Sequence, residues 1–402
     1  MLESDSPYTI HDIDFWKISL SLALASFFVF ASIYAIQPLL PVFVADYGIS
    51  VSASSLLLSL TIIGLIIGLI ILGFLSDRLG RTIFIKLSLI GTVIPFLMIP
   101  LFESYYLFII LRFLQGFASA GLLASALAYL NEEMDRRSVG VATGLYISSN
   151  ALGGMAGRVV TGYLTDHYSW PTAFYVLGLA GVFIFFIVLF LLPKSRYFKP
   201  SELPFRKDLI GFGHHLKTPS LLVVFGLGII LQFSFTGVWT YLPFYLEGPP
   251  FELSLKTISY MFFAYGIGII ASPIAGWMVG HLKLTPMRVA GVLVLSSGVF
   301  ITLSSSIIMI VIGLCVLCLG FFIAHSLTAT TVSEQATHHK GSAASLYLVS
   351  YYIGVAFGST LLSPIWSSFG WSGLVLVAGF VPLIYIIFAQ LMSRKMRTIR
   401  AR

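Results

Sequence analysis

Three ionisable side chains lie inside long apolar stretches of the sequence: Arg112, Arg158 and His325. A charged arginine in hydrocarbon is costly unless a partner or water compensates it, so such residues often belong to a site. An arginine can hold an anionic group, and a histidine, with an ordinary pKa of about 6.5, can exchange a proton near neutral pH. The alternative for each residue is a structural hydrogen bond to neighbouring groups. The sequence alone leaves both interpretations open.

The carboxylates lie elsewhere, because none of the 16 acidic residues falls at the centre of an apolar stretch. We therefore take His325 as the leading candidate for carrying a proton. Accessory candidates are Arg112, Asp46, which follows the first apolar stretch, and Glu334, nine residues after His325. Asp46 is equally interpretable as a solvated loop residue. With Arg112 and Arg158 inside, the interior field is positive, which favours anionic, zwitterionic or neutral molecules over dications.

Polar and aromatic residues at helical spacing extend this candidate site. Gln232, Thr236 and Trp239 follow each other in steps of four and three, so they share one face of a helix. The predicted binding residues are Tyr34, Gln37, Gln115, Asn150, Arg158, Gln232, Thr236, Trp239, Tyr265, Tyr347 and Tyr351. For each aromatic residue the alternative is ordinary packing.

The elements that position these residues follow from the composition. The chain is 58% hydrophobic and 10% charged, whereas a soluble domain is about 25% charged, so an integral membrane protein is predicted. Apolar stretches long enough to cross a bilayer as helices predict an all-α membrane protein with twelve spans. These lie near 17–42, 54–75, 83–101, 105–130, 139–163, 171–193, 219–245, 256–280, 286–303, 306–330, 342–366 and 371–392.

The basic residues give the orientation of these spans, since loops in the cytoplasm collect Lys and Arg. With the amino terminus inside, 20 of the 23 Lys and Arg residues fall on the inner side, and only Lys256 falls outside. We therefore expect the protein in the cell membrane (plasma or inner membrane), with both termini on the cytoplasmic side. The net charge of +7 then reflects topology, so no nucleic-acid partner is expected. We also expect no cleaved signal peptide.

The chain divides into two halves. We predict a tail at 1–16, a six-helix bundle at 17–193, a basic cytoplasmic linker at 194–218, a second six-helix bundle at 219–392 and a basic tail at 393–402. Residues 145–170 align without a gap on residues 346–371, which pairs Gly153 with Gly354 and Gly157 with Gly358. Two parallel six-helix repeats are typical of transporters that bind substrate between their halves.

A charged turn interrupts the apolar sequence at GFLSDRLGRT, residues 73–82. Gly73 and Gly80 allow helix ends to approach and turn sharply, and Asp77 can attract arginines. The stretch resembles the signature of the major facilitator superfamily, Gly-x-Leu-Ala-Asp-Arg-x-Gly-Arg-Lys, at Gly73, Leu75, Asp77, Arg78, Gly80 and Arg81. The resemblance implies a conformational latch on the cytoplasmic side. The alternative is a loop that only follows the distribution of positive charge.

Two further motifs support the same resemblance, which is greatest to the twelve-helix drug and sugar efflux branches. Arg112, Gln115 and Gly116 match an Arg-x-x-Gln-Gly stretch. The glycines of the antiporter motif, a helix-packing pattern, are met at Gly144, Gly153, Gly157 and Gly162, but Arg158 replaces its proline and Thr161 one of its glycines. Small residues at this spacing let two helices pack closely. Antiport is therefore implied, with departures from the motif at Arg158 and Thr161.

The resemblance implies a monomeric secondary transporter that exports a small organic molecule by rocker-switch alternating access, coupled to proton antiport. The alternative within transporters is proton symport or uniport of an anionic metabolite, which Arg158 favours. The sequence has no phosphate-binding loop of the Gly-x-x-x-x-Gly-Lys-Ser/Thr type. No cofactor or metal is expected. A membrane-embedded enzyme or sensor, the alternative of a different class, would need a nucleophile and base, a metal cluster or a signalling domain.

Overall fold

The computed structural model describes residues 6–201, 212–278, 283–336 and 340–400. Parts of the predicted amino-terminal tail, linker, eighth span and carboxyl-terminal tail thus lie outside the described residues. Within these ranges the chain forms α-helices and short 3-10 helices, and its β pairing is an isolated bridge between Tyr8 and Met134. The predicted all-α membrane fold is confirmed.

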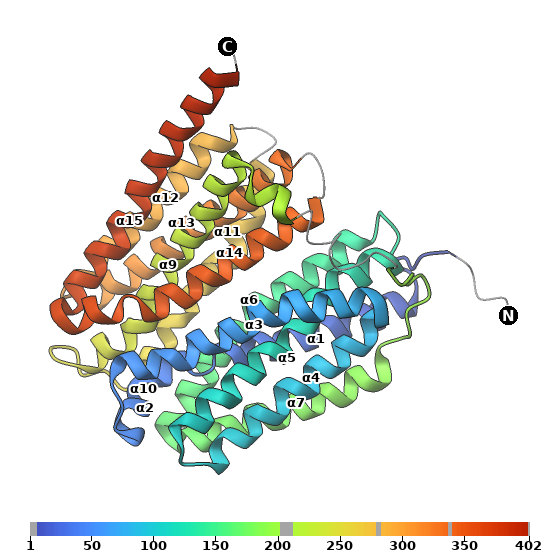
Figure 1. Cartoon of the computed structure of the whole chain (residues 1–402). Helices are drawn as coiled ribbons and strands as arrows, with labels where there is room; N and C mark the ends of the chain where they lie inside the picture. Colours follow the sequence, from blue (N-terminus) through green and yellow to red (C-terminus); the bar gives the residue numbers. More distant parts are fainter. Residues whose placement is uncertain (1–5, 202–211, 279–282, 337–339, 401–402) are drawn as a thin grey trace. The chain divides into compact units, whose positions relative to one another are not determined.

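The helices separate into two compact units, each described here by itself. Unit 1 comprises Met1–Gly48 and Leu60–Glu202, and unit 2 comprises Ile49–Ser59 and Leu203–Arg402. Helix α3 contributes to both. Six long helices come first along the chain: α1 (Ile13–Tyr34), α3 (Val51–Leu79), α4 (Arg81–Met98), α5 (Tyr105–Glu133), α6 (Val139–His167) and α7 (Trp170–Leu191) (Figure 1). A shorter helix, α2 (Leu40–Tyr47), lies between α1 and α3.

Unit 2 contains the remaining helices. They are α9 (Pro219–Glu247), the short α10 (Leu255–Tyr260), α11 (Tyr265–Met278), α12 (Leu284–Ile301), α13 (Ile307–Gln335), α14 (Lys340–Thr360) and α15 (Ser363–Arg400). In the described part of the chain, nine helical segments are long and apolar enough to cross a membrane. The other three predicted spans coincide with α6, with α10 and α11, and with α14. Polar residues lower the mean hydropathy of α6 and α14. A 3-10 turn at Met261–Ala264 interrupts the eighth span.

The first predicted span, 17–42, lies within one candidate membrane-spanning segment, Ile13–Tyr47, whose α-helix is interrupted after Tyr34. Helix α1 ends at Tyr34, a 3-10 turn covers Gln37–Leu39, and α2 begins at Leu40. Pro38 and Pro41 contribute to the break, because proline lacks the backbone N–H that would donate to the carbonyl four residues earlier. The last carbonyls of α1 consequently need partners outside their own helix.

A repeated contact joins one helix pair in each unit. In unit 1, Gly153 and Gly157 of α6 lie directly on the backbone of Phe27 and Ala31 in α1. In unit 2, Gly354 and Gly358 of α14 lie in the same way on Ile229 and Phe233 of α9. In each case a Cβ atom would overlap with the opposite backbone, so only glycine permits the approach. We call these two contacts the glycine clasps.

The last helix contains a kink at Gly370. Gly370, within the bounds of α15, has φ 59° and ψ −154°, a conformation outside the helical region. The predicted twelfth span begins at the next residue, Trp371. The indole of Trp371 donates to the carbonyl of Thr302 at 3.0 Å, which ties the kink to the end of α12.

Candidate functional site

Arg112 binds the interrupted end of α1. Its guanidinium donates to the carbonyl oxygens of Ser32 at 3.1 Å and Ile33 at 2.6 Å, and to Oε1 of Gln115 at 2.7 Å. Arg112 and Gln115 are both fully buried. The last four carbonyls of an α-helix have no partner within that helix, so Arg112 supplies donors where the break in α1 leaves them missing. These contacts fit the alternative given for Arg112, in which the residue forms structural hydrogen bonds to neighbouring groups.

Arg158 contacts the same helix break from α6. Its Nε donates to Oε1 of Gln37 at 2.7 Å, and another guanidinium nitrogen donates to the carbonyl of Gly154 at 2.6 Å. The guanidinium carbon also lies 4.2 Å from the centre of the Tyr34 ring, within the range of a cation–π interaction. Arg158 is only 3% exposed. Three of the predicted binding residues, Tyr34, Gln37 and Arg158, thus lie together, and these partners of Arg158 are uncharged.

Thr161 completes the junction between α1 and α6. Its hydroxyl lies 2.7 Å from the carbonyl oxygens of both Ala35 and Gly157. Ala35 follows the end of α1, so this contact again satisfies backbone polarity created by the break. The replacement of a motif glycine by Thr161 therefore has a local physical reason.

The four glycines of the predicted packing motif differ in their surroundings. Gly153 and Gly157 form the clasp with α1. Gly162 is buried, whereas a Cβ atom on Gly144 would have no described atom within 4 Å. In unit 1, the close helix contact is concentrated in the middle of α6.

His325 lies in unit 2 among aromatic rings. The hydroxyl of Tyr347 is 2.8 Å from His325 Nδ1 and 3.3 Å from the His325 carbonyl oxygen. The imidazole is parallel to the Phe321 ring, with centroids 5.6 Å apart, and its centroid is 4.9 Å from that of Tyr351. The predicted proton carrier is therefore joined to two predicted binding residues, Tyr347 and Tyr351.

The predicted series on α9 is buried within unit 2. The hydroxyl of Thr236 donates to Oε1 of Gln232 at 3.3 Å. Trp239 is fully buried, with its ring centroid 4.8 Å from those of both Phe262 and Tyr265. The indole Nε1 of Trp239 has no hydrogen-bond partner among the described residues. A buried indole N–H normally has an acceptor, so this side chain is suited to receive one from water or a ligand.

The remaining predicted site residues lie apart from these groups. Asn150 of α6 is half-buried, and its Oδ1 has no hydrogen-bond partner among the described residues. Asp46, at the end of α2, is exposed and accepts a hydrogen bond of 2.7 Å from Trp170 Nε1. Glu334 is exposed near the end of α13. Nine residues of helix separate it from His325, or about 13 Å along the axis.

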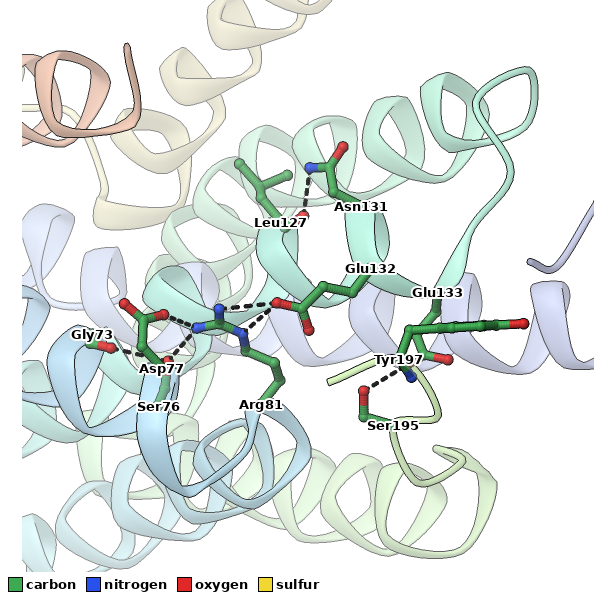
Figure 2. Close-up of polar contacts among 10 residues, drawn as sticks. All are labelled: Gly73, Ser76, Asp77, Arg81, Leu127, Asn131, Glu132, Glu133, Ser195 and Tyr197. Carbon is green, nitrogen blue, oxygen red and sulfur yellow. Dashed lines mark hydrogen bonds and ion pairs between the residues drawn. The ribbon is translucent and has the colours of Figure 1, made fainter. Parts of the chain in front are cut away.

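The charged turn forms a compact network with the end of α5 (Figure 2). Arg81 pairs with Asp77, donates to Ser76 Oγ at 3.0 Å, and makes two contacts of 3.0 Å with Glu132 Oε1. Gly80 has φ 112°, which lets the chain pass directly from α3 into α4. We call Ser76, Asp77, Arg81 and Glu132 the Arg81 network.

The other members of the turn support its shape. Ser76 Oγ donates to the carbonyl of Gly73 at 3.2 Å. Arg78 folds back on its own helix, where it donates to the carbonyl of Phe74 at 3.0 Å and covers the Phe74 ring at 3.4 Å. The sequence pattern predicted this turn but not the pairing of Glu132 with Arg81, because no motif linked the two residues.

The neighbouring Glu133 holds two chain segments that sequence analysis treated as plain tail and linker. Its Oε1 accepts hydrogen bonds from Ser195 Oγ and from the backbone N–H groups of Arg196 at 2.7 Å and Tyr197 at 3.2 Å. Its carbonyl accepts from the N–H of Tyr8 at 2.9 Å. Glu133 is fully buried. A pair of glutamates that ends an apolar span was the available signal.

Comparison with known proteins decides the family. The model of the Major Facilitator Superfamily matches residues 22–359. The chain belongs to this superfamily. It is 33% identical over 390 residues to the inner membrane transport protein YnfM of Escherichia coli K12, covering 96% of this chain and 92% of that protein. It is 32% identical over 383 residues to the uncharacterized transporter YybF of Bacillus subtilis, covering 95% of each chain.

Two solved transporter structures share the fold. A nucleoside transporter, NupG, superposes with a TM-score of 0.78 at 13% identity, over 93% of this chain and 99% of that one. A D-xylose–proton symporter gives a TM-score of 0.75 at 17% identity, over 93% and 97% of the two chains. These likenesses concern the fold alone. The superfamily member described here is thus a multi-pass membrane transporter of a small molecule.

Proposed function

We propose that this transporter exports an anionic or zwitterionic small organic molecule in exchange for protons, by rocker-switch alternating access. The observation that carries the proposal is the setting of Arg158, a buried guanidinium that lies with the predicted binding residues Gln37 and Tyr34 at the interrupted end of α1. The planar guanidinium fork matches the geometry of a carboxylate or phosphate group. We propose that an anionic group of the substrate binds at this guanidinium.

His325 is the proposed proton carrier. No carboxylate occupies the centre of a predicted span, and imidazole is the side chain whose charge changes most readily near neutral pH. Its contacts with Tyr347 and Tyr351 place it among proposed binding residues of unit 2. Uptake of a proton here changes the charge that a bound substrate experiences.

The second candidate function is symport or uniport of an anionic metabolite. Arg158 favours it, because this arginine stands where the antiporter motif has proline, and the bend that proline would introduce is absent. For both candidates we propose cytoplasmic termini, a monomeric transporter, and an Arg81 network that stabilises one conformational state.

The direction of coupling is measured in proteoliposomes containing purified protein and a pH-sensitive dye. A thermal-shift screen of organic anions, zwitterions and neutral amphiphiles first selects the compounds. Antiport predicts that a selected compound moves against the proton flux, whereas symport predicts movement with it. Stabilisation only by neutral or cationic compounds would contradict the proposed substrate class.

His325→Gln tests the proton carrier, because glutamine keeps a hydrogen-bonding side chain but does not titrate. We expect this variant to bind the selected compound normally and to transport it without coupling to the pH gradient. Tyr385→Phe serves as the control, since it removes a hydroxyl elsewhere in unit 2. Unchanged pH dependence in His325→Gln would exclude this residue as the carrier.

A further inference from the structure

The hydroxyl of Tyr347 lies within hydrogen-bond distance of two atoms of His325. The oxygen lies 2.8 Å from Nδ1 and 3.3 Å from the carbonyl oxygen of the same residue. A carbonyl oxygen only accepts hydrogen bonds, whereas an imidazole nitrogen donates or accepts according to its protonation. The single hydroxyl proton therefore has two positions, toward Nδ1 or toward the carbonyl, with the heavy atoms unmoved.

We propose that Tyr347 is a positioning residue that adapts its hydrogen bond to the protonation state of His325, an inference that rests on the proposed proton coupling. When Nδ1 is unprotonated, the hydroxyl donates to it. When the ring is charged, Nδ1–H donates to the phenolic oxygen and the hydroxyl proton points to the carbonyl. Uptake of one proton at Nδ1 thus adds one positive charge and leaves Tyr347 neutral. Release reverses both hydrogen bonds.

The Tyr347 ring is held in place by unit 2. A Cβ atom at residue 228 would lie 2.8 Å from Tyr347 Cε2, so Gly228 of α9 makes room for the ring. Tyr347 is 6% exposed and packs in a cluster with Leu221, Val224 and Phe225. Its ring is inclined by 19° to the imidazole, with centroids 5.6 Å apart. The hydroxyl is therefore kept within reach of both acceptor positions.

The charged and titratable groups around this pair make the hydrogen bond important. Arg288 of α12 donates to Thr331 Oγ1 at 2.9 Å and interacts electrostatically with Tyr347. From α14, Tyr351 faces the imidazole, and the α9 residues packed on Tyr347 are apolar. A nearby guanidinium repels a second positive charge. An acceptor for Nδ1–H is then needed to stabilise the imidazolium.

The test is a nitrogen-15 NMR titration of histidine-labelled protein in lipid nanodiscs, with the His325 signals assigned by loss in His325→Gln. It reads tautomer and protonation directly and needs no substrate. In Tyr347→Phe we expect half-protonation of His325 at a pH lower by roughly one unit, because a hydrogen bond to a charged group contributes on that order. We also expect a changed tautomer in the neutral ring.

Tyr385→Phe is the matched control. It also removes a tyrosine hydroxyl from unit 2, one that donates to the Val223 carbonyl at 3.0 Å, and should leave the His325 titration unchanged. Should Tyr347→Phe fail to fold, 3,5-difluorotyrosine at 347 replaces it. This more acidic phenol is a poorer acceptor for Nδ1–H, so the titration should again move to lower pH.

An unchanged His325 titration and tautomer in the Phe or difluorotyrosine protein would overturn the inference. Its failure is distinguishable from that of the proposed function. If His325→Gln loses proton coupling while the Tyr347 variants titrate like wild type, only the role of Tyr347 is wrong. If His325→Gln keeps its coupling, the proposed proton carrier is wrong even where the NMR result confirms the hydrogen-bond exchange.

Discussion

One methyl group at Gly157 should reveal how firmly α1 and α6 are joined. A Cβ atom there would lie 2.2 Å from the Ala31 carbonyl oxygen, whereas ordinary contact begins near 3.4 Å, so Gly157→Ala must separate the helices by about 1.2 Å. Two bonds of 2.7 Å, from Thr161 to Ala35 and from Arg158 to Gln37, cross this region. The same displacement would stretch both to about 3.9 Å, beyond the length of a hydrogen bond.

The expected loss of stability follows from these two effects. Overpacking of a close contact costs about 1–3 kcal/mol, and an interhelical hydrogen bond in a membrane protein contributes about 0.6 kcal/mol. Together they predict a loss of about 2–4 kcal/mol for Gly157→Ala. A loss of this size corresponds to a fall of roughly 5–15 °C in apparent melting temperature for a unit of this size.

The assay follows monodisperse protein by size-exclusion chromatography after heating. Gly144→Ala is the matched control, because it lies on the same helix and a Cβ atom there meets nothing within 4 Å. Alanine suits a helix better than glycine, so this control should be neutral or slightly more stable. Equal melting temperatures for the two variants would refute the reasoning, since the clasp would then yield to a methyl group without cost.

Three further predictions concern charged residues. Asp77→Asn should lower transport while membrane insertion stays normal, because it weakens the Arg81 network and alters the balance of conformational states; lost expression with normal transport per molecule would contradict this. Arg158→Lys should weaken ligand binding and Arg158→Gln should weaken it further in folded protein, so normal affinity in the Gln variant would exclude the anionic substrate. Glu133→Gln should expose residues 195–197 to limited proteolysis, because it weakens hydrogen bonds to their N–H groups, whereas Glu132→Gln should not.

Local patterns in the sequence predicted the helices and the charged turn. Apolar length located the spans, and the predicted start of the last one, Trp371, directly follows the kink at Gly370. The glycine spacing predicted close packing of α6, although the partner helix and the exact contact with Ala31 required the structure. These features depend on neighbouring residues, which is why the sequence contains them.

Features formed by residues distant in sequence were not predictable in this way. The role of Arg112 depends on where α1 ends, and the pairing of Arg81 with Glu132 joins positions 51 residues apart. Glu133 binds the start of the linker through backbone N–H groups, which every residue except proline provides. A contact to the backbone does not require a particular side chain in the partner residue, so the partner's residue type does not reveal the contact.

The glycine clasps also bear on how this chain arose. The same contact occurs in both units at positions 201 residues apart, as expected if a six-helix ancestor already had it before its gene was duplicated. The residues proposed for chemistry are not repeated: Arg158 corresponds to Ser359, and the bounds of α5 and α13, 202 residues apart, pair His325 with Leu123. The two units therefore share one packing contact but differ in these side chains, with the buried guanidinium in unit 1 and the imidazole in unit 2.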